Sequence, residues 1–302
     1  MSLDSLVAIL TALTLQANPS VHAIPTTVNT LPVAADVAVP AAPVKRRVES
    51  LGVATTAKSA IVVDVGSGAV LYAKDAKVER PIASLTKLVT AMVVLDEGLR
   101  GEQPMTIQGG DFEATRPDLM IGDTLSRREA LRAMLSGSVN EIANAFARTS
   151  PNGRAAFIEA MNAKAATLGL EHAIFEEPTG INPRNRATAA DVARLLRSAL
   201  AYPDIREMTT QGRYDAKMLS GRTVRIDPTN LLLPSYLNQP PYRIVAGKTG
   251  SLPEAGYCLA QATENGEGKQ IITVVLGSTD HFVRFQDVKA LTSWTFDTYE
   301  WR

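Results

Sequence analysis

Short apolar runs occur near residues 60–73 and again near residues 244–277. Ala60–Val65 and Ala69–Ala73 lie on either side of Gly66-Ser67-Gly68. Apolar runs on both sides of a glycine-rich turn are typical of two antiparallel strands. Further runs of this kind come near the other end of the chain, at Ile244–Gly250, Gly256–Thr263 and Gln270–Gly277. The pattern therefore predicts strands at the beginning and at the end of the fold.

The segments between these strands have helical spacing. From Ser84 to Gly98 the apolar residues recur every three or four positions, and Gly98 is suited to end a helix. Two later segments begin with the spacing of a helix capping box, Ser126-x-x-Glu129 and Thr188-x-x-Asp191. The expected helices cover residues 84–98, 126–135, the run after 140, 155–168, 188–200 and 285–299.

This order of elements indicates the α/β fold class. Strands at both ends with helices between them predict a sheet whose first and last strands meet, together with a helical insert.

The first residues have a pattern of targeting rather than of a fold. Leu6–Leu15 is an apolar run of ten residues, which is too short to cross a bilayer core of about 30 Å as a helix. Val21-His22-Ala23 follows and resembles a signal-peptidase site, although no Lys or Arg precedes the apolar run. We interpret residues 1–23 as a secretory signal; the alternative is a short buried or interfacial helix.

Residues 24–56 contain Pro25, Pro32, Pro40 and Pro43 among Ala, Val and Thr. Proline interrupts both helical and ladder hydrogen bonding, so this segment is expected to be an extended linker. The folded domain is expected to cover residues 57–302.

Composition excludes several classes of protein. The 302 residues include 31 Lys and Arg and 31 Asp and Glu, a balance that argues against a nucleic-acid binder. Cys258 is the single cysteine, which excludes an intrachain disulfide, and the three histidines lie far apart, which makes a metal site improbable. No cofactor is expected, so the chemistry has to come from hydroxyl, amine, carboxyl and amide groups.

Ser84-Leu85-Thr86-Lys87 opens the first expected helix. A spacing of three residues places the Ser84 hydroxyl and the Lys87 amine on one helical face. A neutral lysine there could take the serine proton and make the oxygen nucleophilic. The alternative for this pattern alone is an N-cap serine beside a solvated lysine.

Two further motifs complete a set. Ser138-Val139-Asn140 lies between two expected helices, where a hydroxyl and an amide can face one cleft. Lys248-Thr249-Gly250 ends an apolar strand, and its glycine permits close approach of a ligand or of backbone. Either motif alone has an ordinary structural explanation, but the three together and in this order indicate a catalytic site.

These three motifs resemble the signature of the penicillin-binding proteins and serine β-lactamases. The longer stretches PIASLTKLVTAMVVLD, EPTGINPRNRATAADVARL and IVAGKTGSLPEAGYCLA are similar to the low-molecular-mass DD-peptidases that trim peptidoglycan, most of all to their endopeptidase type. The resemblance implies an antiparallel sheet flanked by helices, with an all-helical lobe. It also implies peptidoglycan peptides as substrates and β-lactam antibiotics as covalent inhibitors.

The resemblance implies a role for each motif residue. Ser84 would form the acyl-enzyme, Lys87 would be its general base, and Ser138 would pass a proton to the leaving amine. The remaining motif residues would bind substrate: Asn140, Lys248, Thr249, Gly250 and Ser251. Lys248 would also keep the site electropositive, and the backbone N–H groups of Ser84 and Ser251 would form an oxyanion hole. Family members often have Arg where this chain has Tyr257, which leaves open how a substrate carboxylate is held there.

Three alternatives to an endopeptidase follow from the same motifs. A D-alanyl-D-alanine carboxypeptidase would use the same site. A class A β-lactamase would need a deacylating glutamate, and Glu177 and Asn182 imitate that pair at a spacing of five rather than four, so Glu177 is expected to be a surface or loop residue. An inactive penicillin-binding sensor would lack a catalytic residue, and this chain has all of them. Cys258 is expected to be an inert core thiol.

The location follows from the same resemblance. After Gly250 the chain has room for two strands and one helix, and it has no basic amphipathic tail of the kind that anchors related carboxypeptidases. We therefore expect a periplasmic enzyme, secreted across the inner membrane, with no stable membrane anchor and no nucleic-acid partner.

Overall fold

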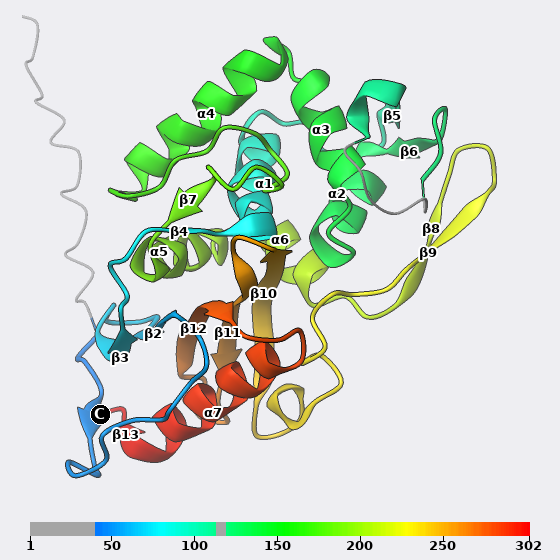
Figure 1. Ribbon diagram of the computed structural model, residues 1–302. Coiled ribbons are helices and arrows are strands. Elements are labelled where there is room, and N and C mark those ends of the chain that lie inside the picture. The colour runs from blue at the N-terminus through cyan, green and yellow to red at the C-terminus, as the bar shows by residue number, and fades with distance from the viewer. Residues whose placement is uncertain (1–39, 113–118) are drawn as a thin grey trace, which may run out of the picture. The chain divides into compact units, whose positions relative to one another are not determined.

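A five-stranded antiparallel sheet organises the described residues, 40–112 and 119–302, of this computed structural model (Figure 1). Its strand order is β10-β11-β12-β2-β3, so the early strand β2 pairs with the late strand β12. The prediction that the first and last strands meet is therefore confirmed. The strands are β2 (Ser59–Asp64), β3 (Val70–Lys74), β10 (Arg243–Leu252), β11 (Gly256–Glu264) and β12 (Gln270–Ser278).

Both faces of this sheet are buried. Along β2, Ile61 and Val63 belong to the larger apolar cluster, whereas Ala60 and Val62 belong to the smaller one, as the alternation of side chains along a strand requires. Helix α5 (Ala189–Ala199) contributes to the larger cluster, and helix α7 (Val283–Thr298) contributes to the smaller one (Figure 1). Burial on both faces explains why the inner strands β2 and β12 are mostly apolar along their length.

The remaining helices form the helical lobe beside the larger cluster (Figure 1). Helix α1 lies at its centre and is buried from Lys87 to Val94, which explains why its sequence is apolar on every side. The helices of the lobe are α1 (Lys87–Asp96), α2 (Arg127–Ser136), α3 (Asn140–Arg148), α4 (Gly153–Thr167) and α6 (Pro203–Thr209).

Both predicted helix caps form, although one is only half complete. At α5 the Thr188 hydroxyl accepts from the Asp191 N–H at 3.0 Å, and the Asp191 carboxylate accepts from the Thr188 N–H at 3.1 Å. At α2 the Ser126 hydroxyl accepts from the Glu129 N–H at 3.3 Å, while the Glu129 carboxylate lies 3.7 Å from Arg132. The reciprocal acid bond is thus replaced by an ion pair within the helix.

Several short elements were not predicted, because each of them is too brief for its periodicity to be recognised. Helix α6 and the hairpin β8–β9 lie between α5 and β10 in the chain; α6 packs against β10, whereas the hairpin extends away from the sheet (Figure 1). The unpredicted elements are β1 (Val44–Lys45), β4 (Arg80–Pro81), η1 (Ala83–Thr86), β5 (Pro104–Thr106), η2 (Gly109–Asp111), β6 (Thr124–Ser126), β7 (Arg186–Ala187), α6, β8 (Tyr214–Lys217), β9 (Thr223–Ile226), η3 (Tyr236–Asn238) and β13 (Tyr299–Glu300).

The described part of the expected linker belongs to the fold. Val44 and Lys45 in β1 pair with Glu300 and Tyr299 in β13, so the fold includes residues that the sequence interpretation placed before its domain boundary at residue 57. Proline at positions 40 and 43 does not prevent this pairing, because neither residue lies in the two-residue ladder. The expected signal segment lies outside the described residues.

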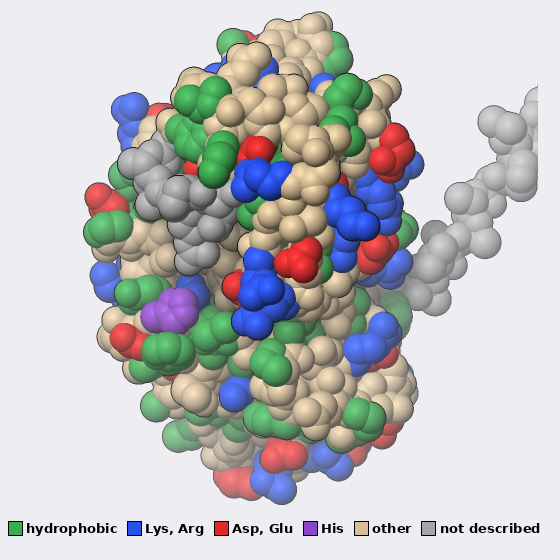
Figure 2. Space-filling model, turned by 90° about the vertical axis from the view of Figure 1, so that its right-hand side faces the viewer, with side chains coloured by type: hydrophobic (Ala, Val, Ile, Leu, Met, Phe, Trp, Pro, Cys, Tyr) green, Lys and Arg blue, Asp and Glu red, His purple; other side chains and the backbone are tan. Residues whose placement is uncertain are grey.

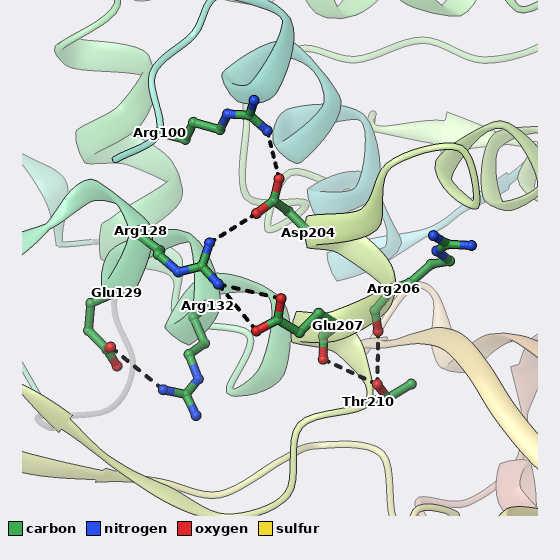
Figure 3. Close-up of polar contacts among 8 residues, drawn as sticks. All are labelled: Arg100, Arg128, Glu129, Arg132, Asp204, Arg206, Glu207 and Thr210. Atoms are coloured by element: carbon green, nitrogen blue, oxygen red, sulfur yellow. Dashed lines mark hydrogen bonds and ion pairs between the residues drawn. The ribbon is translucent and has the colours of Figure 1, made fainter. Parts of the chain in front are cut away.

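Surface ion pairs hold α6 against α2 (Figure 3). The Asp204 carboxylate lies 2.8 Å from Arg100 and 3.3 Å from Arg128, and Arg128 also reaches Glu207 at 3.2 Å. Exposed pairs of this kind each contribute about 0–1 kcal/mol, so they orient α6 more than they stabilise the protein. On the face shown in Figure 2, Lys and Arg side chains are mixed with Asp and Glu side chains rather than gathered in one basic patch. None of the helices among the described residues is long and apolar enough to cross a bilayer.

Candidate active site

Ser84 lies in η1, the short turn that leads into α1, and Lys87 is the first residue of α1. The Lys87 amine is 3.0 Å from the Ser84 hydroxyl oxygen, which is hydrogen-bonding distance. Lys87 is fully buried. The structure thus brings together the two residues of the first motif, and it excludes a solvated lysine.

The Lys87 amine also donates to two oxygens from other parts of the chain. One is Asn140 Oδ1 at 2.6 Å, at the beginning of α3, and the other is the backbone carbonyl oxygen of Thr179 at 2.6 Å. The first contact joins the first two motifs. The second comes from a loop outside the three motifs, and the sequence could not predict it because a backbone carbonyl has no side-chain signal.

Lys248 in β10 joins the third motif to the second. Its amine is also buried, and it donates to the Ser138 hydroxyl at 2.7 Å and to the Thr249 carbonyl at 3.1 Å. Burial is the main cause that lowers the pKa of Lys248 well below its ordinary value, and the nearby charges of Lys87 and Arg284 add to it. Lys248 therefore releases a proton far more readily than a lysine in water.

Close backbone contact holds the strand of the third motif against Ser84. A Cβ atom at Gly250 would lie 2.8 Å from the Ile82 carbonyl oxygen and 3.1 Å from the Ser84 nitrogen. Only glycine allows β10 to lie this close to η1. Beside it, the Thr249 hydroxyl donates to the Thr229 hydroxyl at 2.6 Å, which links β10 to the segment after the β8–β9 hairpin.

Two residues of the site have strained backbone. Ala83 has φ +48° and Ser138 has φ +63°, in a region that residues other than glycine rarely adopt. Each conformation costs of order 1 kcal/mol or more, and it persists because the surrounding contacts determine it. Ala83 precedes Ser84, and Ser138 carries a motif hydroxyl itself. The strained backbone therefore lies where the orientation of these two hydroxyl groups is set.

Most residues of the three motifs border one cleft of about 440 Å³. Ser84, Ser138, Asn140, Thr249, Gly250 and Ser251 line it, whereas Lys87 and Lys248 lie behind its wall, in contact with the lining hydroxyl groups. Two hydroxyl groups of the cleft wall, those of Ser84 and Ser138, therefore each have a buried amine behind them.

Arg284 in α7 is a residue of the cleft wall that the sequence interpretation missed. Its guanidinium is buried, donates to the Gly250 carbonyl at 3.0 Å and lies over the Tyr257 ring at 5.7 Å. Arg284 forms no ion pair with any residue in the described ranges, and burial lowers its pKa to about 10. Tyr257 stands where members of the resembling family often have arginine, and in this structure Arg284 from α7 lies beside it.

Two residues that were weighed at sequence level lie in the interior. Cys258 is buried, and burial raises the pKa of its thiol to about 11, which fits an inert core residue. Glu177 lies in a loop but is buried rather than at the surface. Among residues 40–112 and 119–302, no three His, Cys, Asp or Glu side chains are grouped so that they could hold a metal ion.

Comparison with known proteins agrees with this geometry. The family model of peptidase S11, described as D-alanyl-D-alanine carboxypeptidase, matches residues 45–280. A D-alanyl-D-alanine endopeptidase of Pseudomonas aeruginosa is 35% identical over 240 residues, covering 78% of this chain and 76% of that protein. A D-alanyl-D-alanine endopeptidase of Escherichia coli is 34% identical over 267 residues, covering 85% and 84%.

A solved structure has the same architecture. The crystal structure of a Streptomyces DD-transpeptidase superposes with a TM-score of 0.75 at 31% identity, covering 82% of this chain and all (100%) of that one. The sheet with its helical lobe is therefore the penicillin-binding protein fold, as the motifs implied.

The low pKa of Lys248 predicts a dependence of stability on pH. The unfolded chain has Lys248 near its ordinary pKa, so at neutral pH it binds a proton that the folded state holds weakly. This imbalance costs stability at pH 7, and the cost shrinks as pH rises toward 10. Relative to Lys248→Gln, the wild type should thus gain melting temperature between pH 7 and pH 10, by about 2–4 °C for each kcal/mol recovered. Calorimetry measures this change, with the exposed Lys217→Gln as control. A constant difference between wild type and Lys248→Gln would contradict the prediction.

Proposed function

Because this chain belongs to the peptidase S11 family of D-alanyl-D-alanine peptidases, we propose that it cuts peptide cross-links of peptidoglycan, with Ser84 as the nucleophile. The protein is a hydrolase of the serine DD-peptidase type. The observation that carries the assignment of the nucleophile is the 3.0 Å distance between the Lys87 amine and the Ser84 hydroxyl in the wall of the cleft.

Acylation requires that Ser84 lose its proton as its oxygen attacks the D-alanyl carbonyl carbon. The Lys87 amine is within reach of that proton and acts as the general base. The new Oγ–C bond forms, the carbonyl oxygen gains negative charge, and the carbon–nitrogen bond then breaks. The products are an ester on Ser84 and a free amine.

The leaving amine needs a proton, and Ser138 is placed to supply it. Its hydroxyl lies in the cleft wall and receives a hydrogen bond from the Lys248 amine at 2.7 Å. Ser138 gives its proton to the leaving nitrogen and takes one from Lys248, whose lowered pKa favours that release. Water then attacks the ester carbonyl carbon and passes a proton through Ser138 back to Lys248, while Lys87 returns its proton to the Ser84 oxygen as the ester bond breaks. The shortened peptide leaves as a carboxylic acid that ionises in water, and both lysines regain their starting protonation.

The other motif residues bind the substrate and the charge that develops on it. The backbone N–H groups of Ser84 and Ser251 both border the cleft and form the proposed oxyanion hole, where each donor is typically worth about 3–4 kcal/mol of barrier. Asn140 holds the Lys87 amine and the substrate, and the Thr249 hydroxyl binds the substrate. Gly250 keeps the strand close enough for these contacts.

We propose that Arg284 holds the substrate carboxylate, since this chain has Tyr257 where family members often have arginine. A buried guanidinium without an ion-pair partner among the described residues attracts a carboxylate, and this one borders the cleft beside the strand of Lys248. We assign Arg284 to a carboxylate of the substrate peptide.

Relatives support cross-links as the preferred substrate. The two relatives at 35% and 34% identity are named endopeptidases, whereas the family model has the name of a carboxypeptidase. We therefore place the amine side of a D-Ala–diaminopimelate cross-link in the leaving-group half of the cleft, with removal of terminal D-Ala as the second candidate activity.

The proposed location is the periplasm, where peptidoglycan lies. The apolar run Leu6–Leu15 and the site-like Val21-His22-Ala23 support it as the pattern of an export signal.

The first prediction for this function is covalent labelling at Ser84. A fluorescent penicillin should acylate the wild type and stay attached through denaturing electrophoresis, and peptide mass mapping should find it on Ser84. Ser84→Ala should show no label, and Lys87→Ala should be labelled about 10²–10⁴-fold more slowly, because the general base is lost. Turnover of penicillin at many molecules per second would instead identify a β-lactamase.

The second prediction concerns the substrate. Purified cross-linked muropeptide dimers should be converted to monomers, while pentapeptide monomers should lose D-Ala more slowly. Mass spectrometry of both digests measures the two rates, with Ser84→Ala as the control for contaminating hydrolases. Release of D-Ala without loss of dimers would assign the carboxypeptidase activity instead.

A further inference from the structure

The loop that follows α4 supplies the carbonyl of Thr179 to Lys87, and it comes from none of the three motifs (Figure 1). Neighbouring Pro178 gives its carbonyl to the Thr90 hydroxyl at 2.7 Å, one helical turn further along α1. Two successive carbonyl groups of this loop are therefore directed at α1. The rest of the loop must hold both carbonyl groups in this orientation. Its internal contacts therefore affect the position of the Lys87 amine, the proposed general base.

The Glu177 carboxylate is the centre of those contacts. Its two oxygens accept hydrogen bonds from five donors of the same loop: Thr179 N at 2.6 Å, Thr179 Oγ1 at 2.5 Å, Gly180 N at 2.6 Å, Asn182 N at 3.3 Å and Asn185 Nδ2 at 2.9 Å. The side chain is 7% exposed. A buried carboxylate of this kind stabilises the conformation of the loop, because three backbone N–H groups of the loop donate to it.

The same loop is pressed against the turn that carries Ser84. Gly180 has φ +88°, and a Cβ atom there would lie 2.0 Å from the Ala83 carbonyl oxygen. Asn185 binds the turn from its other side, since its carbonyl accepts from the Ile82 N–H at 3.1 Å and its amide donates to the Thr86 hydroxyl at 3.2 Å. Through Asn185 and Gly180 the Glu177 carboxylate is thus linked to the residues on both sides of Ser84.

We infer that Glu177 is a positioning residue for acylation: it holds the Thr179 carbonyl on the Lys87 amine and the loop against the Ser84 turn. This inference rests on the proposed roles of Ser84 and Lys87. The Lys87 amine is held from three sides, by Ser84, Asn140 and Thr179. If the loop carbonyl moves, the amine loses one fixed acceptor and its geometry toward the Ser84 hydroxyl with it.

The position of Glu177 opposes the role of a deacylating base, which the Glu177 and Asn182 pattern of the sequence left open. A general base must be reached by the water that it activates. Both oxygens of Glu177 instead accept hydrogen bonds from backbone and side-chain donors of its own loop, in a buried position. The two roles predict opposite effects of one substitution, because a positioning residue changes acylation and a deacylating base changes hydrolysis of the ester.

Glu177→Gln is the test. The amide keeps the size of the side chain but replaces one acceptor oxygen by an N–H group, which faces the donors of the loop. Stopped-flow measurement with a fluorescent penicillin gives the acylation rate constant at saturation, the dissociation constant of the preceding complex, and the lifetime of the acyl-enzyme. We expect acylation to fall by about 10²-fold, as for displacement of a catalytic group by about 1 Å, with little change in the dissociation constant or the lifetime.

Asp191→Asn is the matched control. Asp191 is also a buried acid, 3% exposed, and its carboxylate accepts from the Thr188 hydroxyl at 2.6 Å and from the Thr188 N–H at 3.1 Å, where it caps α5. Both substitutions should lower the melting temperature. Asp191→Asn should leave the acylation rate constant within about twofold of wild type, because α5 does not touch Lys87 through this cap.

The outcomes separate the alternatives. Wild-type acylation of Glu177→Gln would overturn the inference, and normal acylation with a longer-lived acyl-enzyme would assign Glu177 as a deacylating base. A wild type that is not labelled at Ser84 would refute the proposed function itself. If Glu177→Gln does not fold, Thr179→Val and Thr179→Ser decide: the valine removes the hydroxyl donor to Glu177 and should slow acylation, whereas the serine keeps it and should restore the rate. Equal rates for the two variants would overturn the inference.

Discussion

Burial of two lysine amines in one wall of a cleft is the constraint on which the rest of this site depends. Lys87 and Lys248 are both almost completely removed from water. Such amines are tolerated only if their N–H groups find oxygen acceptors. The acceptors are Ser84, Asn140 and Thr179 for the first amine, and Ser138 with a strand carbonyl for the second. Those acceptors include the proposed nucleophile and the proposed proton donor, so satisfying the amines brings the proposed catalytic groups together.

The junction of the two apolar clusters is where this assembly becomes possible. The edge strand β10 belongs to the sheet, α1 and α3 belong to the helical lobe, and the η1 turn lies between them. Contact at this junction is backbone to backbone, since β10 touches η1 at Gly250 and the Glu177 loop touches it at Gly180. The strained conformations of Ala83 and Ser138 are stabilised by this packing. The precision of the site is thus supplied by the whole interface between sheet and lobe.

The charge distribution of the cleft fits the proposed binding of a substrate carboxylate. Lys248 and Arg284 lie on the same side, from β10 and α7, and neither forms an ion pair within the described ranges. Burial lowers the pKa values of both groups, and repulsion from the Arg284 charge adds to the lowering for Lys248. An incoming carboxylate would relieve that repulsion, which is a physical reason for such a cleft to select peptides with free carboxyl groups.

The sequence by itself determined the sheet strands, most helices and all three motifs, because long apolar runs and fixed spacings are local properties of the chain. It also identified Ser84 with Lys87, which are one helical turn apart. Tertiary structure alone decided that Lys248 donates to Ser138 and that Thr179 supplies a carbonyl to Lys87, because these partners are far apart in the chain and one is a backbone atom. It likewise decided the burial of Glu177 and the place of Arg284. Spacing along a chain predicts which groups share an element, whereas the contact between elements depends on how their side chains and backbones pack.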